Sequence, residues 1–196
     1  MAHRRIAAIV LAAGLSSRLA PHNKLLAPMP DGNALITQTA RQALASAARP
    51  VIVVTGFQAP LVEAALADLP LTLVHAPDFV EGLTASLRAG VTALPSEAKA
   101  AVIMLGDMPL VEPDLLNALL AAYEPQAGAD IVIPVWRGQR GNPRLWGRRY
   151  FREILSLSGD TGAGRLLAAH ASRVAEITAP SDAVLRDFDT QAAFDS

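Results

Sequence analysis

Basic and small side chains follow the first apolar run of the chain at a spacing that suits phosphate binding. After "IAAIVL" the sequence continues "AAGLSSRLAPHNK", which brings Gly14, Arg18 and Lys24 into one short segment. Small residues let backbone N–H groups approach an anion closely, a guanidinium offers a fork of donors, and an ammonium adds a point charge. The segment matches neither a Walker loop nor the dinucleotide fingerprint. The residues alone leave two interpretations open: a phosphate site, or an ordinary strand-to-helix connection with solvated charges.

Carboxylates stand at two places that could supply a divalent cation with oxygen ligands. Asp107 follows the apolar run "AAVIML", and Asp187 and Asp189 alternate in "VLRDFDT" near the end of the sequence, after the strand-like "AVL". Alternation along an extended segment would point Asp187 and Asp189 to one face. Mg²⁺ prefers such oxygen ligands and bridges phosphate oxygens. The alternatives are a turn residue at Asp107 and a solvated acidic tail at the other two positions.

A third polar segment, "HAPDFVEGLTASLRAG", follows the third apolar run. We expect a helix to begin between Gly82 and Ser86, where free N–H groups and hydroxyls could meet a ligand. The simpler interpretation is that Thr84 or a neighbour caps this helix.

Histidine and cysteine offer no competing chemistry. The chain has no cysteine, which excludes disulfides, thiolate catalysis and cysteine-ligated metal. The histidines show no metal-ligand spacing: His3, His22, His75 and His170.

The elements that must position these residues follow a regular alternation. Expected strands are "IAAIVL", "PVIVVT", "LTLVH", "AAVIML" and "DIVIPV". Expected helices cover residues 35–47, 60–68, 83–94, 113–123, 148–157 and 164–171. The apolar runs lack polar alternation, which is typical of strands covered by helices on both faces. The pattern predicts an α/β fold, a three-layer, doubly wound, mostly parallel sheet of Rossmann-like type, in one domain over residues 1–196.

One polar excursion, "WRGQRGNPRLW", interrupts this alternation, and we expect a hairpin or flap there. It carries the polar side chains Arg137, Arg140, Asn142 and Arg144. They suit a phosphorylated ligand, or simply a solvated surface. "SGDTGAGR" places Asp160 at another helix start. Trp136 and Trp146 could stack on a planar ligand or pack in the core.

Bulk properties exclude several classes of protein. The chain has 196 residues, is 52% hydrophobic and carries a net charge of -1, which predicts a folded protein without general affinity for nucleic acid or anionic membranes. No apolar stretch approaches the roughly eighteen residues of a membrane span. "RRIAAIVLAAG" is also similar to a signal peptide, but cleavage after Ala13 would remove the strand that opens the alternation. We therefore expect a first strand and a cytoplasmic protein.

Several motifs together carry a family resemblance. "LAAGLSSRLAPHNK" resembles the signature L-A-[AG]-G-x-x-x-R-[ML]-G-x-x-K of the MobA-like nucleotidyltransferases, and its "AAG" is similar to the molybdenum cofactor cytidylyltransferase branch. The match continues in order through "EGLTASLRAG", "LGDMPLV", "RGNPRLW", "SGDTGAGRLL" and "VLRDFDT". One departure is Ala20, which stands where the family usually has glycine.

The resemblance implies a Mg²⁺-dependent nucleotidyltransferase that moves CMP from CTP to the phosphate of a molybdopterin-type cofactor and releases pyrophosphate. A molybdoenzyme that receives the product is an implied partner. Two alternatives stay open. One is a guanylyl- or other nucleotidyltransferase for a different phosphorylated small molecule, and the other is a non-catalytic carrier or chaperone of the cofactor, which the substitution at Ala20 keeps open.

The resemblance also implies roles for individual residues. The catalytic residues it implies are Arg18, Lys24 and Asp107. The nucleotide-binding residues it implies are Leu11, Ala12, Ala13, Gly14, Arg18, Lys24, Gly82 and Ser86. Arg140, Asn142 and Asp160 would bind the acceptor, and Asp107 with Asp189 would hold the metal.

Overall fold

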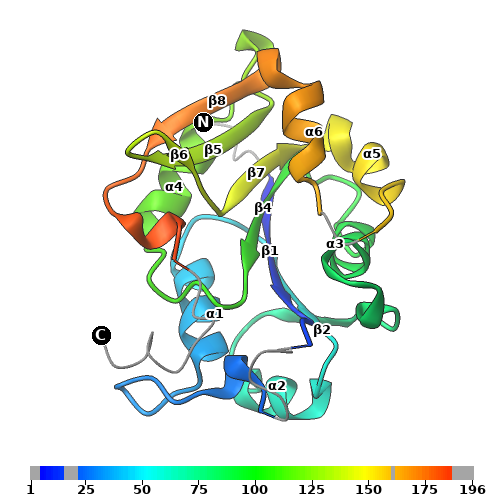
Figure 1. Ribbon diagram of the computed structural model, residues 1–196, viewed down its shortest axis with the longest axis vertical. Helices are drawn as coiled ribbons and strands as arrows, with labels where there is room; N and C mark the ends of the chain where they lie inside the picture. Colours follow the sequence, from blue (N-terminus) through cyan, green and yellow to red (C-terminus); the bar gives the residue numbers. More distant parts are fainter. Residues whose placement is uncertain (1–4, 16–21, 160–161, 187–196) are drawn as a thin grey trace.

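The computed structural model describes residues 5–15, 22–159 and 162–186, which form a sheet with helices on both faces (Figure 1). The strands are β1 (Ile6–Ala12), β2 (Val51–Thr55), β3 (Thr72–His75), β4 (Ala100–Leu105), β5 (Ile131–Trp136), β6 (Gln139–Arg140), β7 (Arg144–Gly147) and β8 (Val174–Thr178). Their order is β3-β2-β1-β4-β7-β5-β6, and β8 pairs with β5. Strands β3, β2, β1 and β4 run parallel to one another, whereas β7 is antiparallel to β4 and β5. This mostly parallel sheet confirms the predicted fold class.

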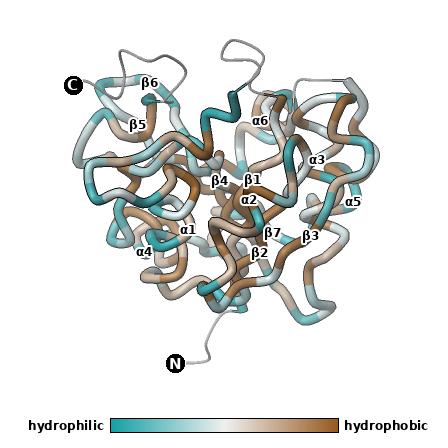
Figure 2. Tube along the Cα trace, turned by 90° about the horizontal axis from the view of Figure 1, so that it is seen from below, coloured by the Kyte–Doolittle hydropathy of each residue, from teal (hydrophilic) through white to brown (hydrophobic). Residues whose placement is uncertain are grey.

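The helices form two layers, one on each face of the sheet, and each layer packs against the sheet through its own apolar cluster. The helices are α1 (Leu35–Ala45), α2 (Ala59–Leu66), α3 (Leu83–Thr92), α4 (Pro113–Ala122), α5 (Phe151–Leu155) and α6 (Gly164–Ala169). Side chains of α1, α2 and α4 form one cluster against the sheet, and those of α3, α5 and α6 form the other. Figure 2 shows the hydrophobic stretches gathered around β1, β2 and β4, with hydrophilic ones outside them. Within the described ranges, no helix has the length and apolar character needed to cross a membrane.

The first apolar run forms the central strand of the parallel part of the sheet. Every residue of β1 is buried. Ala8, Val10 and Ala12 belong to the cluster under α1, whereas Ile9 and Leu11 belong to the cluster under α3. A strand packed on both faces needs no polar alternation, so the prediction for this run is confirmed.

The expectation that every strand is covered on both faces is wrong for β3. Thr72, Leu73 and His75 are exposed. Strand β3 pairs only with β2 and therefore lies at the edge of the sheet. Its apolar run resembles a buried strand because edge position depends on the order of strands, which local sequence does not carry.

The polar excursion is a hairpin at its start, as predicted, but it is not a flap as a whole. Residues 135–136 of β5 pair with residues 139–140 of β6. The chain then returns into the sheet as β7, which pairs with both β4 and β5.

Further differences concern the C-terminal part of the chain. The predicted helix over residues 148–157 divides into a 3-10 turn at residues 148–150 and the short α5. Residues 174–178 add the unpredicted strand β8. The strand-like "AVL" lies instead in and just after a 3-10 turn at Asp182–Val184. These segments depend on distant partners, so their local pattern is a weak guide.

Candidate active site

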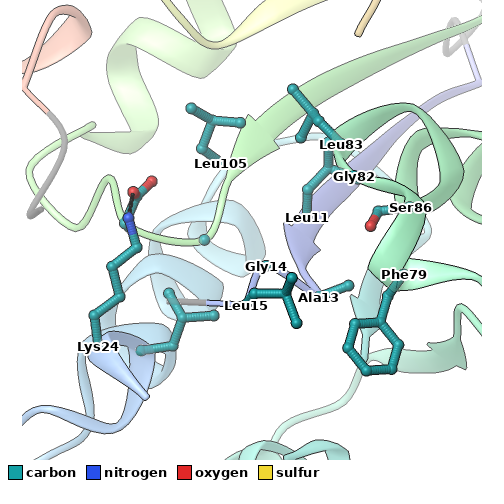
Figure 3. Close-up of a pocket in the computed structure, with 13 residues that line it drawn as sticks. Leu11, Ala13, Gly14, Leu15, Lys24, Phe79, Gly82, Leu83, Ser86 and Leu105 are labelled. Atoms are coloured by element: carbon teal, nitrogen blue, oxygen red, sulfur yellow. Dashed lines mark hydrogen bonds and ion pairs between the residues drawn. The ribbon is translucent and has the colours of Figure 1, made fainter. Parts of the chain in front are cut away.

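A pocket of about 350 Å³ lies beyond the carboxyl ends of β1 and β4 (Figure 3). Its lining residues come from four segments of the chain: Leu11, Ala13, Gly14 and Leu15; Lys24 and Leu25; Phe79, Gly82, Leu83 and Ser86; Leu105, Gly106 and Asp107. We call it the first pocket. The strand order reverses between β1 and β4, and ligands of open α/β sheets bind at such a reversal.

A charged pair occupies one end of the first pocket. Lys24 Nζ lies 2.5 Å from Asp107 Oδ2, and the two side chains are 20% and 9% exposed. The other carboxylate oxygen, Asp107 Oδ1, is buried and has no hydrogen-bond partner within the described part of the chain. A buried acceptor without a donor is unfavourable, so this oxygen suits a bound cation. Across residues 5–15, 22–159 and 162–186, no three histidine or acidic side chains gather into a metal cluster.

The position of Lys24 is set by its neighbour Asn23. The buried Asn23 carboxamide accepts a hydrogen bond from the Leu25 amide at 3.0 Å and donates one to the Phe57 carbonyl at 3.2 Å. It thereby begins the 3-10 turn Lys24–Leu26 and attaches that turn to the connection after β2. Sequence reasoning missed Asn23, although asparagine before a helical turn is a common capping signal.

The position of Asp107 is set by backbone contacts of Gly106. The Gly106 amide donates to the Leu11 carbonyl at 2.9 Å, and the Gly106 carbonyl accepts from Thr39 Oγ1 at 2.9 Å. A Cβ at position 106 would lie 2.9 Å from the Leu11 oxygen, which explains why glycine is needed there. Thr39 is a buried residue of α1 that sequence reasoning also missed, because its partner is distant in the chain.

The opposite end of the first pocket is mostly uncharged. Figure 3 shows Phe79 and Ser86 across the pocket from Lys24. Ala13 contributes to the wall although it is only 1% exposed. Gly82 is the N-cap residue of α3 and has a φ of 101°, a conformation that favours glycine.

The expectation that Thr84 or a neighbour caps α3 is wrong, because the first turn has no side-chain cap. Thr84 Oγ1 instead accepts a hydrogen bond from the Gly162 amide at 3.1 Å. This buried bond joins the start of α3 to the loop that precedes α6.

A second pocket of about 250 Å³ adjoins the first and shares Leu11, Leu83 and Leu105 with it. Its other lining residues are Leu87, Ile103, Asn142, Arg144, Trp146, Gly162, Ala163 and Gly164. The polar excursion and the glycine-rich loop therefore meet beside the first pocket. Trp146 packs in the core as well as lining this pocket, whereas Trp136 does not line it.

The structure brings most of the nucleotide-binding residues implied by the resemblance to one place. Leu11, Ala13, Gly14, Lys24, Gly82 and Ser86 line the first pocket, and so does Asp107, which was implied as a catalytic residue and metal ligand. Ala12 does not, because its side chain packs in the cluster on the other face of the sheet. Arg18 and Asp189, like Asp187, lie outside the described residues.

The residues implied for acceptor binding separate. Asn142 lines the second pocket, but exposed Arg140 donates from Nε to Glu176 Oε1 at 2.8 Å on β8 and does not line it. Asp160 lies outside the described residues. The half-buried Arg144 lines the second pocket and was not selected among the acceptor contacts. Burial, with a smaller effect of the Arg140 charge, lowers the pKa of Arg144.

Comparison with known proteins agrees with this geometry. The family model described as "MobA-like NTP transferase domain" matches residues 8–174. The molybdenum cofactor cytidylyltransferase of Escherichia coli is 31% identical over 138 residues, which are 70% of this chain and 67% of that protein. The matches to two bifunctional GlmU proteins span only 28% and 29% of their lengths.

Solved structures extend the similarity over the whole fold. Rv0371c from Mycobacterium tuberculosis is 29% identical with a TM-score of 0.86, covering 100% of this chain and 97% of that one. A structure of the same protein in complex with manganese is 27% identical with a TM-score of 0.82, covering 97% and 96% of the two chains. With its family match, its sheet order and its pocket at the β1/β4 reversal, the chain belongs to the MobA-like NTP transferase domain family and is a nucleotidyltransferase.

Proposed function

We propose that this chain transfers CMP from CTP to the phosphate of a molybdopterin-type cofactor. The observation that carries the proposal is the Lys24–Asp107 pair at one end of a pocket whose other end is mostly uncharged. A nucleoside triphosphate has the same division between a charged and an uncharged part. The choice of cytidine and of the acceptor is supported by the similarity to the Escherichia coli cytidylyltransferase.

The proposed reaction needs positioned charge rather than a general base. An oxygen of the acceptor phosphate bonds to the α-phosphorus of CTP while the bond from that phosphorus to pyrophosphate breaks. The attacking phosphate is already ionised at neutral pH. Lys24 would bind phosphate oxygens and stabilise charge that develops on the leaving pyrophosphate, and Arg18 and the Gly14 backbone would assist it. Because this reaction needs no thiolate nucleophile, it is compatible with a chain that has no cysteine.

Mg²⁺ is the proposed cofactor, and Asp107 is the residue that would hold it. The fit rests on Asp107 Oδ1, a buried oxygen without a donor in the described part of the chain. When bound, Mg²⁺ supplies charge neutralisation on phosphate oxygens. The resemblance adds Asp189 as a second ligand. The manganese complex of Rv0371c supports a divalent cation in this family.

Selection of cytosine would rest on the wall at Ala13. Its methyl group takes up space that a purine would need, and the nearby Phe79 and Ser86 offer a ring face and a hydroxyl. Steric rejection by one methyl group is typically worth about 1 to 3 kcal/mol, so hydrogen bonds must also contribute. CTP is therefore the proposed substrate, and GTP is the competitor to test.

A panel of nucleoside triphosphates, assayed with Mg²⁺ and molybdopterin or its molybdenum form, tests the proposal through pyrophosphate release. We expect CTP to give the fastest release. Faster release with another triphosphate would reject cytidylyl transfer and favour the broader nucleotidyltransferase alternative. Cofactor binding without release by any triphosphate would favour the carrier or chaperone, which would deliver the cofactor to a molybdoenzyme.

A further inference from the structure

Arg144 projects from the middle of the sheet into the second pocket. In the antiparallel pairing of β7 with β4, Arg144 lies opposite Ile103, and both side chains line this pocket. Arg144 Nε donates to the Gly141 carbonyl at 3.1 Å. Across residues 5–15, 22–159 and 162–186, no carboxylate lies within ion-pair distance of its guanidinium.

Three other arginines on or beside the sheet have carboxylate partners. Arg140 pairs with Glu176, and Arg149 and Arg173 both pair with Asp130. Arg144 is buried enough for its pKa to be lowered, chiefly by loss of solvent. A guanidinium keeps its proton in proteins, so a bound anion is the available means of compensating a half-buried charge.

The surroundings of Arg144 give a ligand both polar and apolar contacts. Asn142 adds a carboxamide to the same pocket, and Trp146 and the shared leucines supply apolar walls. The glycine-rich loop lies close, because a Cβ at Gly164 would be 3.6 Å from Arg144 Nη1. The site therefore combines a cation that has no carboxylate partner in the described part of the chain with a carboxamide and apolar walls.

We propose that Arg144 and Asn142 form an anion-binding subsite for the second substrate. The ligand would carry a phosphate or carboxylate on a flat or apolar body, with the anion on Arg144 and the body against Trp146. That this ligand is the nucleotidyl acceptor rests on the proposed function. The triphosphate would use the Lys24–Asp107 end of the first pocket instead, so the two anions occupy different subsites.

Fluorescence of Trp146 tests the subsite without turnover. The chain has two tryptophans, so Trp136→Phe leaves Trp146 as the reporter in the second pocket. Inorganic phosphate and benzoate, titrated at constant ionic strength, are the probes for a phosphate and for a carboxylate on a flat body. In this background we expect Arg144→Gln to weaken binding of the responding probe roughly tenfold to a hundredfold, the scale of a lost charge-assisted hydrogen bond.

Matched variants in the same background distinguish the loss of the Arg144 contact from a general loss of positive charge. Arg152→Gln removes an exposed arginine of α5 and should leave the affinity unchanged, and Arg144→Lys should restore part of it. Lys24→Ala should not change the Trp146 response, because Lys24 does not line the second pocket.

Two results would overturn the proposed subsite. One is that neither probe changes the fluorescence of Trp146, and the other is that folded Arg144→Gln and its parent bind the probe with equal affinity. Kinetics then test the link to the acceptor. Arg144→Gln should raise the acceptor KM at least tenfold while the Kd of CTP stays within twofold. A wild-type chain that does not transfer CMP would reject the proposed function, whereas the fluorescence titration would still decide on the subsite.

Discussion

The parallel and the mixed halves of the sheet present their functional side chains in different ways. In the parallel half, Lys24 and Asp107 stand on loops after strands, and the two charges are paired with each other. In the mixed half, Arg144 stands within strand β7 and has no carboxylate partner in the described part of the chain. The first arrangement is positioned by backbone and capping contacts, the second by strand register. Substitutions in β7 can therefore change one subsite without disturbing the other.

The strongest test of the parallel half is Asp107→Asn. Loss of the carboxylate removes the proposed metal ligand and the partner of Lys24, and we expect turnover to fall about a thousandfold or more, a loss of several kcal/mol in transition-state stabilisation. The pocket position of Asp107 should leave the melting temperature nearly unchanged. Initial rates of pyrophosphate release at saturating Mg²⁺ measure the effect.

Asp114→Asn is the matched control, because it changes an exposed carboxylate in the first turn of α4. Its rate should equal that of the wild type. Turnover of Asp107→Asn above a tenth of the wild-type value would be incompatible with Asp107 as metal ligand.

Lys24→Ala should produce the next largest effect. We expect kcat to fall by roughly two to three orders of magnitude, the scale of one lost electrostatic contact to a transition state. The control is Lys99→Ala, which removes the other lysine of the chain, exposed immediately before β4. Single-turnover rates should decrease with the steady-state rate. A rise in the KM for CTP with kcat preserved would instead make Lys24 a ground-state binding residue.

Lys24 and Asp107 also show how much of the site can be predicted from the sequence. The apolar runs before Lys24 and Asp107 predicted only that both residues lie at one edge of the sheet, where the carboxyl ends of parallel strands meet, and the family resemblance implied their roles. Asn23 gave a weak local signal as a cap, and Thr39 gave none, because its partner Gly106 is distant in the chain. Local pattern therefore predicts which residues reach the pocket better than which residues fix them there.

The mixed half was predicted less well for the same reason. Strand β7 lies in a polar excursion, and only pairing with β4 and β5 makes it a strand. Once in the sheet, Arg144 faces the second pocket, while Arg140 on β6 pairs with Glu176. Selecting Arg144 rather than Arg140 would have required the register, which sequence pattern does not supply.

Thr84→Val tests how the two halves are joined. Valine keeps the shape but leaves the buried Gly162 amide without its acceptor, so we expect the free energy of unfolding to fall by about 1 to 3 kcal/mol. Denaturant titration measures this loss. Because the bond holds the loop beside the second pocket, the acceptor KM should rise more than the KM for CTP. Thr84→Ser keeps the hydroxyl and should behave like the wild type; equal loss in both variants would assign the effect to packing.

Ala13→Gly should have the smallest effect and addresses the base end of the first pocket. Ala13 lines the pocket but is only 1% exposed, so only part of its methyl group contacts a bound base. One methyl in such a pocket is worth about 1 to 3 kcal/mol, and partial contact places the change near the lower limit, roughly tenfold. The kcat/KM ratio for CTP over GTP should fall by about that factor without reversing, because hydrogen bonds from other residues also read the base. The acceptor KM should not change, since Ala13 does not line the second pocket. An unchanged ratio would remove the methyl group from the specificity argument, and a wild-type preference for GTP would refute cytidylyl transfer while leaving the nucleotidyltransferase assignment intact.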